Sequence, residues 1–226
     1  MELVRSELRL EFDQSTQLLT PARKVFDALA KAPPQGQFRE PGVRIKDSKD
    51  KKLIRWRYEH LAIVLEQTNH RASHLPEFVK NVEIVNSVAP IGKIKEILLI
   101  TNWILPMPQY DFDQLNQWYL KKMTSPEMII PNISIYDSSV ILDSKIGDDF
   151  KLHHQSGPME PKQLLKDHLD FNRKDIPKVF LFLLIGTYYM KVLEYSNEEL
   201  QRILKELVRI SEQHSLDISK VWEDKI

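Results

Sequence analysis

The densest group of chemically useful side chains is a basic segment between Val43 and Arg57. Seven cations and two carboxylates give this segment a net charge of +5. Lysine and arginine supply phosphate contacts, and the interleaved Trp56 and Tyr58 could stack on exposed bases. These residue types predict a nucleic-acid-binding face. The residues predicted to contact nucleic acid are Arg44, Lys46, Lys51, Lys52, Arg55 and Arg57.

The alternation of residue types in the same segment allows a second interpretation. Trp56 and Tyr58 alternate with arginines, which is the two-residue period of a half-buried strand. In such a strand the aromatic rings face the core, and Arg55 and Arg57 form a solvated face. The sequence leaves both interpretations open.

Histidines and carboxylates form a second candidate group at Asp167-His168-Leu169-Asp170. Such residues could ligate a divalent metal or perform acid–base chemistry. On a helix, however, Asp167 and Asp170 share a face from which His168 points away. The spacing therefore favours a polar surface turn.

Two further histidine pairs are equally weak as metal ligands. His153 and His154 are adjacent, so on a regular strand they face opposite sides of the sheet. His70 and His74 have helical spacing, but Pro76 interrupts the expected start of that helix. We therefore expect no metal site.

The composition excludes several classes of chemistry. The 226 residues include no cysteine, which rules out thiolate zinc sites, iron–sulfur clusters and cysteine nucleophiles. Only 6 residues are glycine, and no nucleotide-binding glycine loop or nucleophile-elbow serine motif is present. We expect no catalytic residue and no cofactor.

Charge and hydropathy indicate a cytoplasmic protein. Lys plus Arg and Asp plus Glu both number 32, so a generic polyanion binder is not indicated. Residues 1–12 lack the apolar stretch of a signal peptide. The longest apolar run, 179–190, is shorter than the roughly 20 residues that a membrane-spanning helix needs. We expect no contact with a membrane.

The elements that position these residues predict an α+β protein with a mostly antiparallel sheet. A strand followed by a helix occurs twice, which divides the chain into an N-terminal lobe (1–90) and a C-terminal lobe (91–226) that pack as one compact unit. The two lobes share a continuous sheet or abutting sheets. Each strand–helix pair is followed by a candidate hairpin and another helix.

The expected elements follow from hydrophobic period and capping residues. In the first lobe they are a strand at 3–13, a helix from Thr20, a hairpin at 53–58 and 61–67, and a helix at 75–85. In the second lobe they are a strand at 93–105, a helix capped by Asp111 and Gln114, β-rich residues 133–142, a turn at Gly147-Asp148, a short helix at 164–169, a strand at 179–193, a long helix capped by Ser196 and Glu199, and a short helix at 218–222.

The order of these elements resembles a sporadically distributed bacterial family of uncharacterised proteins. The resemblance rests on the 53–56 and 62–65 strands, a helix with Phe78, and the strand that ends Asn102-Trp103-Ile104-Leu105-Pro106 before a helix. At the C-terminus it includes His214, Trp222 and Ile226. The resemblance implies a shared fold and a bacterial-type origin, and it implies no catalytic residue.

These observations predict a non-catalytic accessory protein that acts through contacts with a protein partner or a second copy of itself. Sporadic families often belong to mobile or defence-related gene clusters, so a role there is an expectation by association. The alternative is an RNA-binding or single-stranded-DNA-binding protein that uses the basic 43–57 face. A hydrolase built on His168 ranks last.

Overall fold

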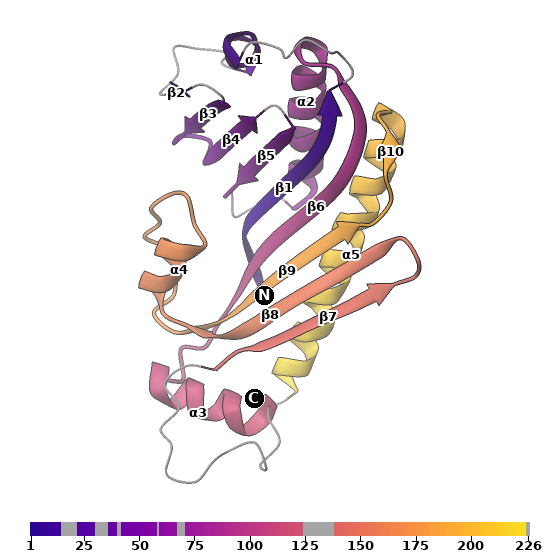
Figure 1. Ribbon diagram of the computed structural model, residues 1–226. Coiled ribbons are helices and arrows are strands. Elements are labelled where there is room, and N and C mark those ends of the chain that lie inside the picture. The colour runs from indigo at the N-terminus through magenta and orange to yellow at the C-terminus, as the bar shows by residue number, and fades with distance from the viewer. Residues whose placement is uncertain are drawn as a thin grey trace.

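A computed structural model describes residues 1–14, 22–29, 36–39, 42–57, 59–66, 71–123 and 138–224. Several features of the sequence prediction lie outside these residues: the helix start at Thr20, Tyr58, the last residue of the 61–67 strand, His70, residues 133–137 and Ile226. Within the described part of the chain, ten strands form one antiparallel sheet (Figure 1). The predicted α+β fold with a long C-terminal helix is confirmed.

The sheet order is β2-β3-β4-β5-β1-β6-β9-β8-β7, and β10 pairs with β6. The strands are β1 (Glu2–Gln14), β2 (Gly36–Arg39), β3 (Gly42–Asp47), β4 (Lys52–Arg57), β5 (His60–Leu65), β6 (Ile91–Pro106), β7 (Val140–Ile146), β8 (Phe150–Met159), β9 (Phe180–Tyr189) and β10 (Leu193–Glu194). The helices are α1 (Ala22–Leu29), α2 (Arg71–Val88), α3 (Phe112–Met123), α4 (Pro161–Asp167) and α5 (Asn197–Glu223).

The two long strands β1 and β6 lie side by side at the centre of the sheet. Outward from β1 the order is β5, β4, β3, and outward from β6 it is β9, β8, β7. The two halves therefore repeat the same order about the β1–β6 pair. The ten strands form one continuous sheet, and the division of the chain into lobes 1–90 and 91–226 stays a prediction.

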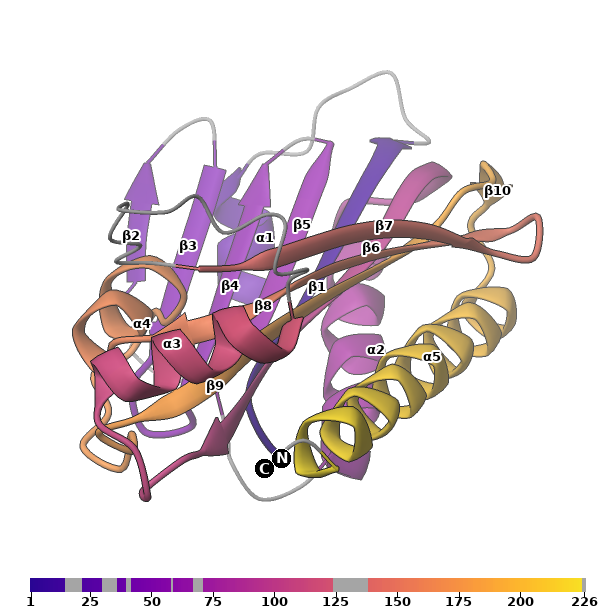
Figure 2. The same cartoon turned by 90° about the horizontal axis from the view of Figure 1, so that it is seen from below.

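Four helices cover one face of the sheet, and we call it the covered face. Apolar residues of α1, α2 and α5 pack on alternate residues of the N-terminal strands, and α3 and the end of α5 pack beside β8 and β9. Figure 2 shows α2 and α5 side by side next to the sheet. Leu8, Leu10 and Phe12 of β1 are at most 1% exposed and point to this face. The two-residue period of each strand sends the intervening side chains to the opposite face.

Capping residues fix where the helices begin. The Asp111 carboxylate accepts a bond from the Gln114 amide at 2.8 Å, and the Gln114 side chain accepts one from the Asp111 amide at 3.0 Å. This reciprocal pair is the predicted capping box. The Ser196 hydroxyl accepts a bond from the Glu199 amide and caps α5, also as predicted.

Four predicted boundaries are wrong because tertiary packing overrides local signals. Helix α2 begins at Arg71 and continues through Pro76, although proline removes one backbone donor. Helix α4 covers Pro161–Asp167 rather than 164–169. Strand β9 ends at Tyr189 rather than at 193. Residues 218–222 are the last turns of α5, where buried Trp222 packs against the covered face.

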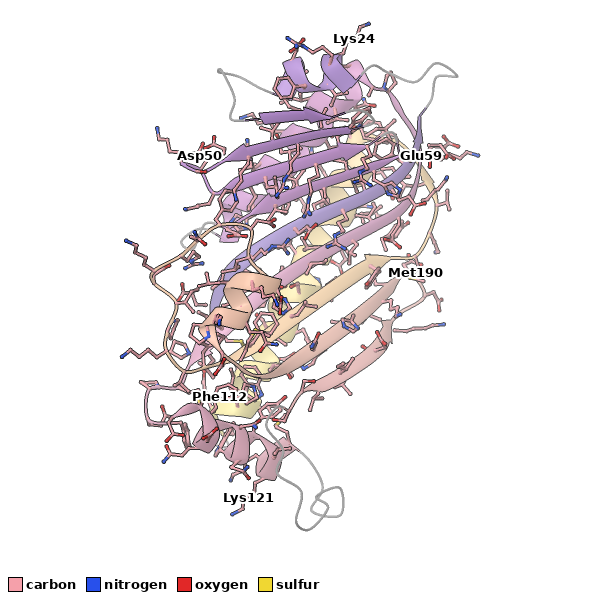
Figure 3. All side chains as sticks on the ribbon, turned by 60° about the vertical axis from the view of Figure 1, so that its left-hand side comes forward. Lys24, Asp50, Glu59, Phe112, Lys121 and Met190 are labelled. Carbon is pink, nitrogen blue, oxygen red and sulfur yellow. The ribbon has the colours of Figure 1, made fainter. Side chains whose placement is uncertain are left out.

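The opposite face is covered only in part by described residues. Helix α4 and the segment after it lie over one end, on a small cluster that includes Val4, Ile104 and Phe182. In Figure 3, α4 stands in front of the sheet and α5 behind it. The rest of this surface, over β3, β4, β5, β1, β6 and the hairpin β7–β8, is here called the open face.

Candidate functional site

Strand pairing places five cationic side chains in one line across the open face. Successive register partners run from β3 to β7, and every position in the line points to the same face. We call this line the cationic row. In order it consists of Arg44, Arg55, Ala62, Arg9, Leu98, Tyr188, Lys151 and Lys145.

The cationic row crosses eight strands and contains no carboxylate. With strands about 4.8 Å apart, its length is roughly 34 Å. The side chains of Arg9, Arg55 and Lys151 are 51%, 42% and 43% exposed, so their charges reach solvent. Lys151 Nζ lies 5.8 Å from the ring centre of Tyr188, which adds an aromatic face to the row.

A groove of about 420 Å³ lies over the N-terminal half of the row, between β4 and β6. Its floor includes Ala62 and Leu10, and its walls carry charges of both signs. The next line of register partners, toward the β4–β5 turn, is Arg57, His60, Glu11 and Glu96. The groove therefore has an acidic side at β1 and β6 and a basic side at β4.

Buried Glu7 anchors the arginines of this groove. Its carboxylate is 1% exposed and accepts bonds from Arg9 Nε at 2.8 Å and Arg55 at 3.2 Å. Arg5, itself buried, completes the set from the other side. The Glu7 carboxylate thus orients three guanidinium groups: Arg5 and Arg9 of β1, and Arg55 of β4.

Glu7 is held in its charged form by these partners. Burial acts to raise the pKa of Glu7, but the hydrogen bond from Arg9 and the charges of Arg5, Arg9 and Arg55 outweigh it and lower that pKa. The bond with Glu7 in turn raises the pKa of Arg9. Glu7 and Arg9 therefore stay charged at neutral pH.

A second buried carboxylate ties the segment after α4 to the sheet. Glu66 accepts bonds from the backbone amides of Asp170 at 2.5 Å and Phe171 at 3.2 Å. The Asp170 side chain also contacts Arg5 at 3.3 Å. Burial raises the pKa of Glu66 to about 7, against the lowering effect of those amide bonds and of Arg5.

Three of the six predicted nucleic-acid contacts lie on the open face. Arg44 and Arg55 are register partners in the cationic row, and Arg57 lies in the next line. No described acidic side chain pairs with Arg44 or Arg57. Arg55 and Arg57 line the groove, and Arg44 lies beside Arg55 on the next strand.

The three predicted lysines are placed elsewhere. Lys46 donates to the Asp170 carbonyl and lies 4.5 Å from the ring centre of Phe171. Lys51 lies at 5.5 Å from the same ring. Lys52 pairs with Glu77 of α2 at 2.7 Å, so it points to the covered face. The basic segment is therefore divided between the two faces of the sheet.

The aromatic residue of the segment is in the core. Trp56 is 0% exposed and packs in the main cluster of the covered face. Its neighbours Arg55 and Arg57 point the other way. The half-buried-strand interpretation is therefore right for Trp56, and Tyr188 of β9 is the aromatic side chain that the open face offers instead.

The histidine pair 153–154 divides between faces as the strand period requires. His153 contacts Asp143 at 3.1 Å on the open face. His154 is 2% exposed on the covered face, where Nε2 contacts the Ser156 hydroxyl at 2.6 Å and Nδ1 contacts His214. Tyr119 donates to the Ser156 carbonyl at 2.9 Å. These side chains form a buried hydrogen-bonded chain that joins α3, β8 and α5.

The other candidate histidines have structural contacts. His74 Nδ1 lies 2.9 Å from the Ser6 hydroxyl between α2 and β1. His168 follows the last turn of α4, and its ring lies against Phe182 at 4.6 Å. In the described part of the chain, no three histidine or acidic side chains are grouped to hold a metal ion.

The enclosed space on the covered face is small. A cavity of about 20 Å³ lies between α2, α5, β1 and β6 and is lined by Ser6, Thr101 and Ser211 among others. This volume holds about one water molecule. Substrate-sized space is therefore found, among the described residues, in the groove of the open face.

The charged and aromatic residues of the cationic row that the sequence prediction missed are Arg9, Tyr188, Lys151 and Lys145. Lys145 and Lys151 pair within one hairpin, whereas Arg9 and Tyr188 lie in β1 and β9, far from that hairpin and from each other in the chain. The only signal was the alternation Glu7-Arg9-Glu11 in β1. Strand order and register were needed to align the rest.

A scan against protein-family models found no family that matches this chain, and a search of curated proteins found no relative. No helix among the described residues is long and apolar enough to cross a membrane.

Proposed function

We propose that the protein binds single-stranded nucleic acid, with the phosphate backbone along the cationic row of the open face. The observation that carries this proposal is that Arg44, Arg55, Arg9, Lys151 and Lys145 lie in one line of register partners in which no position is a carboxylate. The carboxylates of Glu7 and Asp143 lie beside this line and hold Arg9, Arg55 and Lys151 in place. Cations aligned in this way neutralise successive phosphates and release their counterions.

Shape and chemistry favour a single strand over a duplex. Tyr188 lies in the row, so its ring can stack on an unpaired base, whereas the bases of a duplex are already stacked. The Tyr188 ring packs over Gly186, where a Cβ would lie 3.4 Å from a ring carbon, so the absence of a side chain at Gly186 accommodates the ring on the sheet. Side chains on the face of an antiparallel sheet are a common platform for unpaired bases.

The acidic residues beside the row restrict the path of the ligand. Glu11 and Glu96 lie on one side of the groove and repel phosphates that leave the row in that direction. On the other side the segment after α4 covers the sheet. The preferred path therefore runs across the strands, from β3 toward β7.

The experiment is a titration of fluorescent single-stranded RNA and DNA with the full chain at several salt concentrations. The salt slope is the slope of log affinity against log salt concentration, and each lost phosphate contact makes it less steep by somewhat less than one. Arg44→Ala and Lys151→Ala lie in opposite halves of the row. Each should weaken binding and lower the slope by about 0.7. Lys205→Ala removes an exposed cation of α5 on the other side of the sheet and should change neither.

Tyr188→Leu tests the stacking contact separately. This change keeps the net charge and an apolar side chain. It should therefore weaken the binding free energy by about 1–3 kcal/mol and leave the salt slope unchanged. Absence of binding by the parent chain at low salt, or equal losses for Lys205→Ala and Arg44→Ala, would remove the proposal.

The alternative function is an accessory protein that acts through protein contacts. The observation that favours it is the exposed edge of β7. Co-purification of the tagged protein from its native host tests it, and the absence of a stoichiometric protein partner together with a monomeric mass counts against it.

A further inference from the structure

Strand β7 forms one edge of the sheet, and its residues 141–145 are exposed. It pairs with β8 on one side, and no described strand pairs with its other side. Two large apolar side chains stand on it, Ile141 at 58% and Leu142 at 54% exposure. The backbone donors and acceptors along that outer side are available to another strand.

The sequence of β7 complements itself when it is turned end to end. Its residues are Val140-Ile141-Leu142-Asp143-Ser144-Lys145-Ile146. An antiparallel pair centred on Ser144 places Asp143 opposite Lys145 of the partner subunit, and the two-fold axis repeats that contact. Leu142 then lies opposite Ile146 of the partner subunit, also twice.

We propose that β7 pairs with β7 of a second copy of this chain, antiparallel and centred on Ser144, so that two sheets join into one. Neighbouring registers that keep the two open faces on the same side are disfavoured. A pair centred on Asp143 brings two carboxylates together, and one centred on Lys145 brings two ammonium groups together. Charge complementarity thus selects one register.

The faces of the two copies are compatible in this arrangement. Asp143 and Lys145 both point to the open face, since they pair with His153 and Lys151 of β8. Leu142 and Ile146 point to the covered face, opposite His154 and Phe150. A two-fold axis perpendicular to the sheet keeps these sides matched, so polar contacts form on one face and apolar contacts on the other.

The ionic pairs contribute specificity rather than most of the affinity. A cross-strand pair of opposite charges is worth roughly 0.2–1 kcal/mol, and a like-charge pair costs a similar amount. Backbone hydrogen bonds and the burial of Leu142 against Ile146 of the partner subunit supply the main attraction. Reversing one charge converts two attractive contacts into two repulsive ones, which is enough to shift a weak dimer toward monomer.

Charge-reversal variants test the proposal by mass measurement. Lys145→Glu leaves acidic residues at both positions, and Asp143→Lys leaves basic residues at both, so each variant alone should lose the dimer. An equimolar mixture restores complementary charges at both contacts and should form a heterodimer. Sedimentation equilibrium over a range of protein concentrations measures all three samples beside the parent chain.

Two controls separate this result from unfolding or general charge effects. Circular dichroism and thermal unfolding check that each variant folds, because Asp143 also contacts His153 and Lys151 within one copy. Lys205→Glu changes charge equally on α5 and should keep the dimer. A parent chain that is monomeric at every concentration, or single variants that dimerise as well as the parent, would overturn the proposal, whereas a heterodimer formed only in the mixture supports it.

Discussion

Nδ1 of His154 lies 2.8 Å from Nε2 of His214, so a strand and the long C-terminal helix are joined by two imidazole rings. The rings are nearly perpendicular, at 84°. One ring must donate and the other accept, which requires a neutral ring on at least one side. Burial and the nearby charges of His214 and His153 lower the pKa of His154 to about 4.

We expect His154 to make the protein less stable in mild acid. The folded state keeps His154 neutral down to about pH 4, whereas the unfolded state binds a proton near pH 6.5. Between these values the unfolded state holds more protons, so the free energy of unfolding falls as pH falls, by at most about 3 kcal/mol. Urea unfolding of the parent chain and His154→Gln from pH 4 to 7 measures the difference. His153→Gln is the matched control and should keep most of the parent's dependence, because burial and His214 lower the pKa of His154 more than His153 does.

Glu66 should give a pH dependence of the opposite sign. Its folded-state pKa of about 7 lies above the ordinary glutamate value of 4.5, so the folded state holds the extra proton between these values. Its contribution to stability is present below about pH 4.5 and is lost as pH rises through 7. The free energy of unfolding of the parent chain, relative to Glu66→Gln, should therefore decrease from pH 5 to 8. A difference that stays constant with pH contradicts this assignment.

Two glycines in adjacent strands should respond differently to a methyl group. A Cβ at Gly157 would lie 2.2 Å from the Ser138 carbonyl oxygen, whereas at Gly186 its nearest neighbour is a Tyr188 ring carbon at 3.4 Å. Because backbone must move only in the first case, Gly157→Ala should destabilise by about 1–3 kcal/mol, and Gly186→Ala by less than about 1 kcal/mol. Thermal unfolding compares them, and equal losses would show that the β7–β8 end of the sheet adapts freely.

The capping box of α3 should be worth about 1 kcal/mol. Asp111→Ala removes the acceptor of the Gln114 amide and leaves that donor without its cap. Asp111→Asn keeps an acceptor oxygen and should retain most of the stability. Denaturant unfolding measures both variants, and identical values for alanine and asparagine would mean that the cap contributes nothing.

Local contacts were predictable from the sequence, and contacts across the sheet were not. The Asp111–Gln114 pair, the Ser196 cap and the turn at Gly147 each depend on residues within four positions, so their residue types suffice. The hairpin of β4 and β5 was predictable for the same reason.

The cationic row and the buried ionic contacts depend on strand order. Arg5 meets Asp170 across 165 residues, and Glu66 binds the amide of Asp170 across 104. Nothing near Lys46 or Lys52 indicates that one contacts Asp170 and the other Glu77. Whether a lysine of β3 or β4 reaches the open face is decided by residues far away in the chain.

The central position of β1 has a consequence for synthesis of the chain. Its register partner β5 ends at Leu65, whereas its other partner begins at Ile91. A nascent chain can therefore close the β1–β5 contact on the ribosome while the other edge of β1 is still unpaired. Until β6 leaves the exit tunnel, that edge is the surface most exposed to wrong partners.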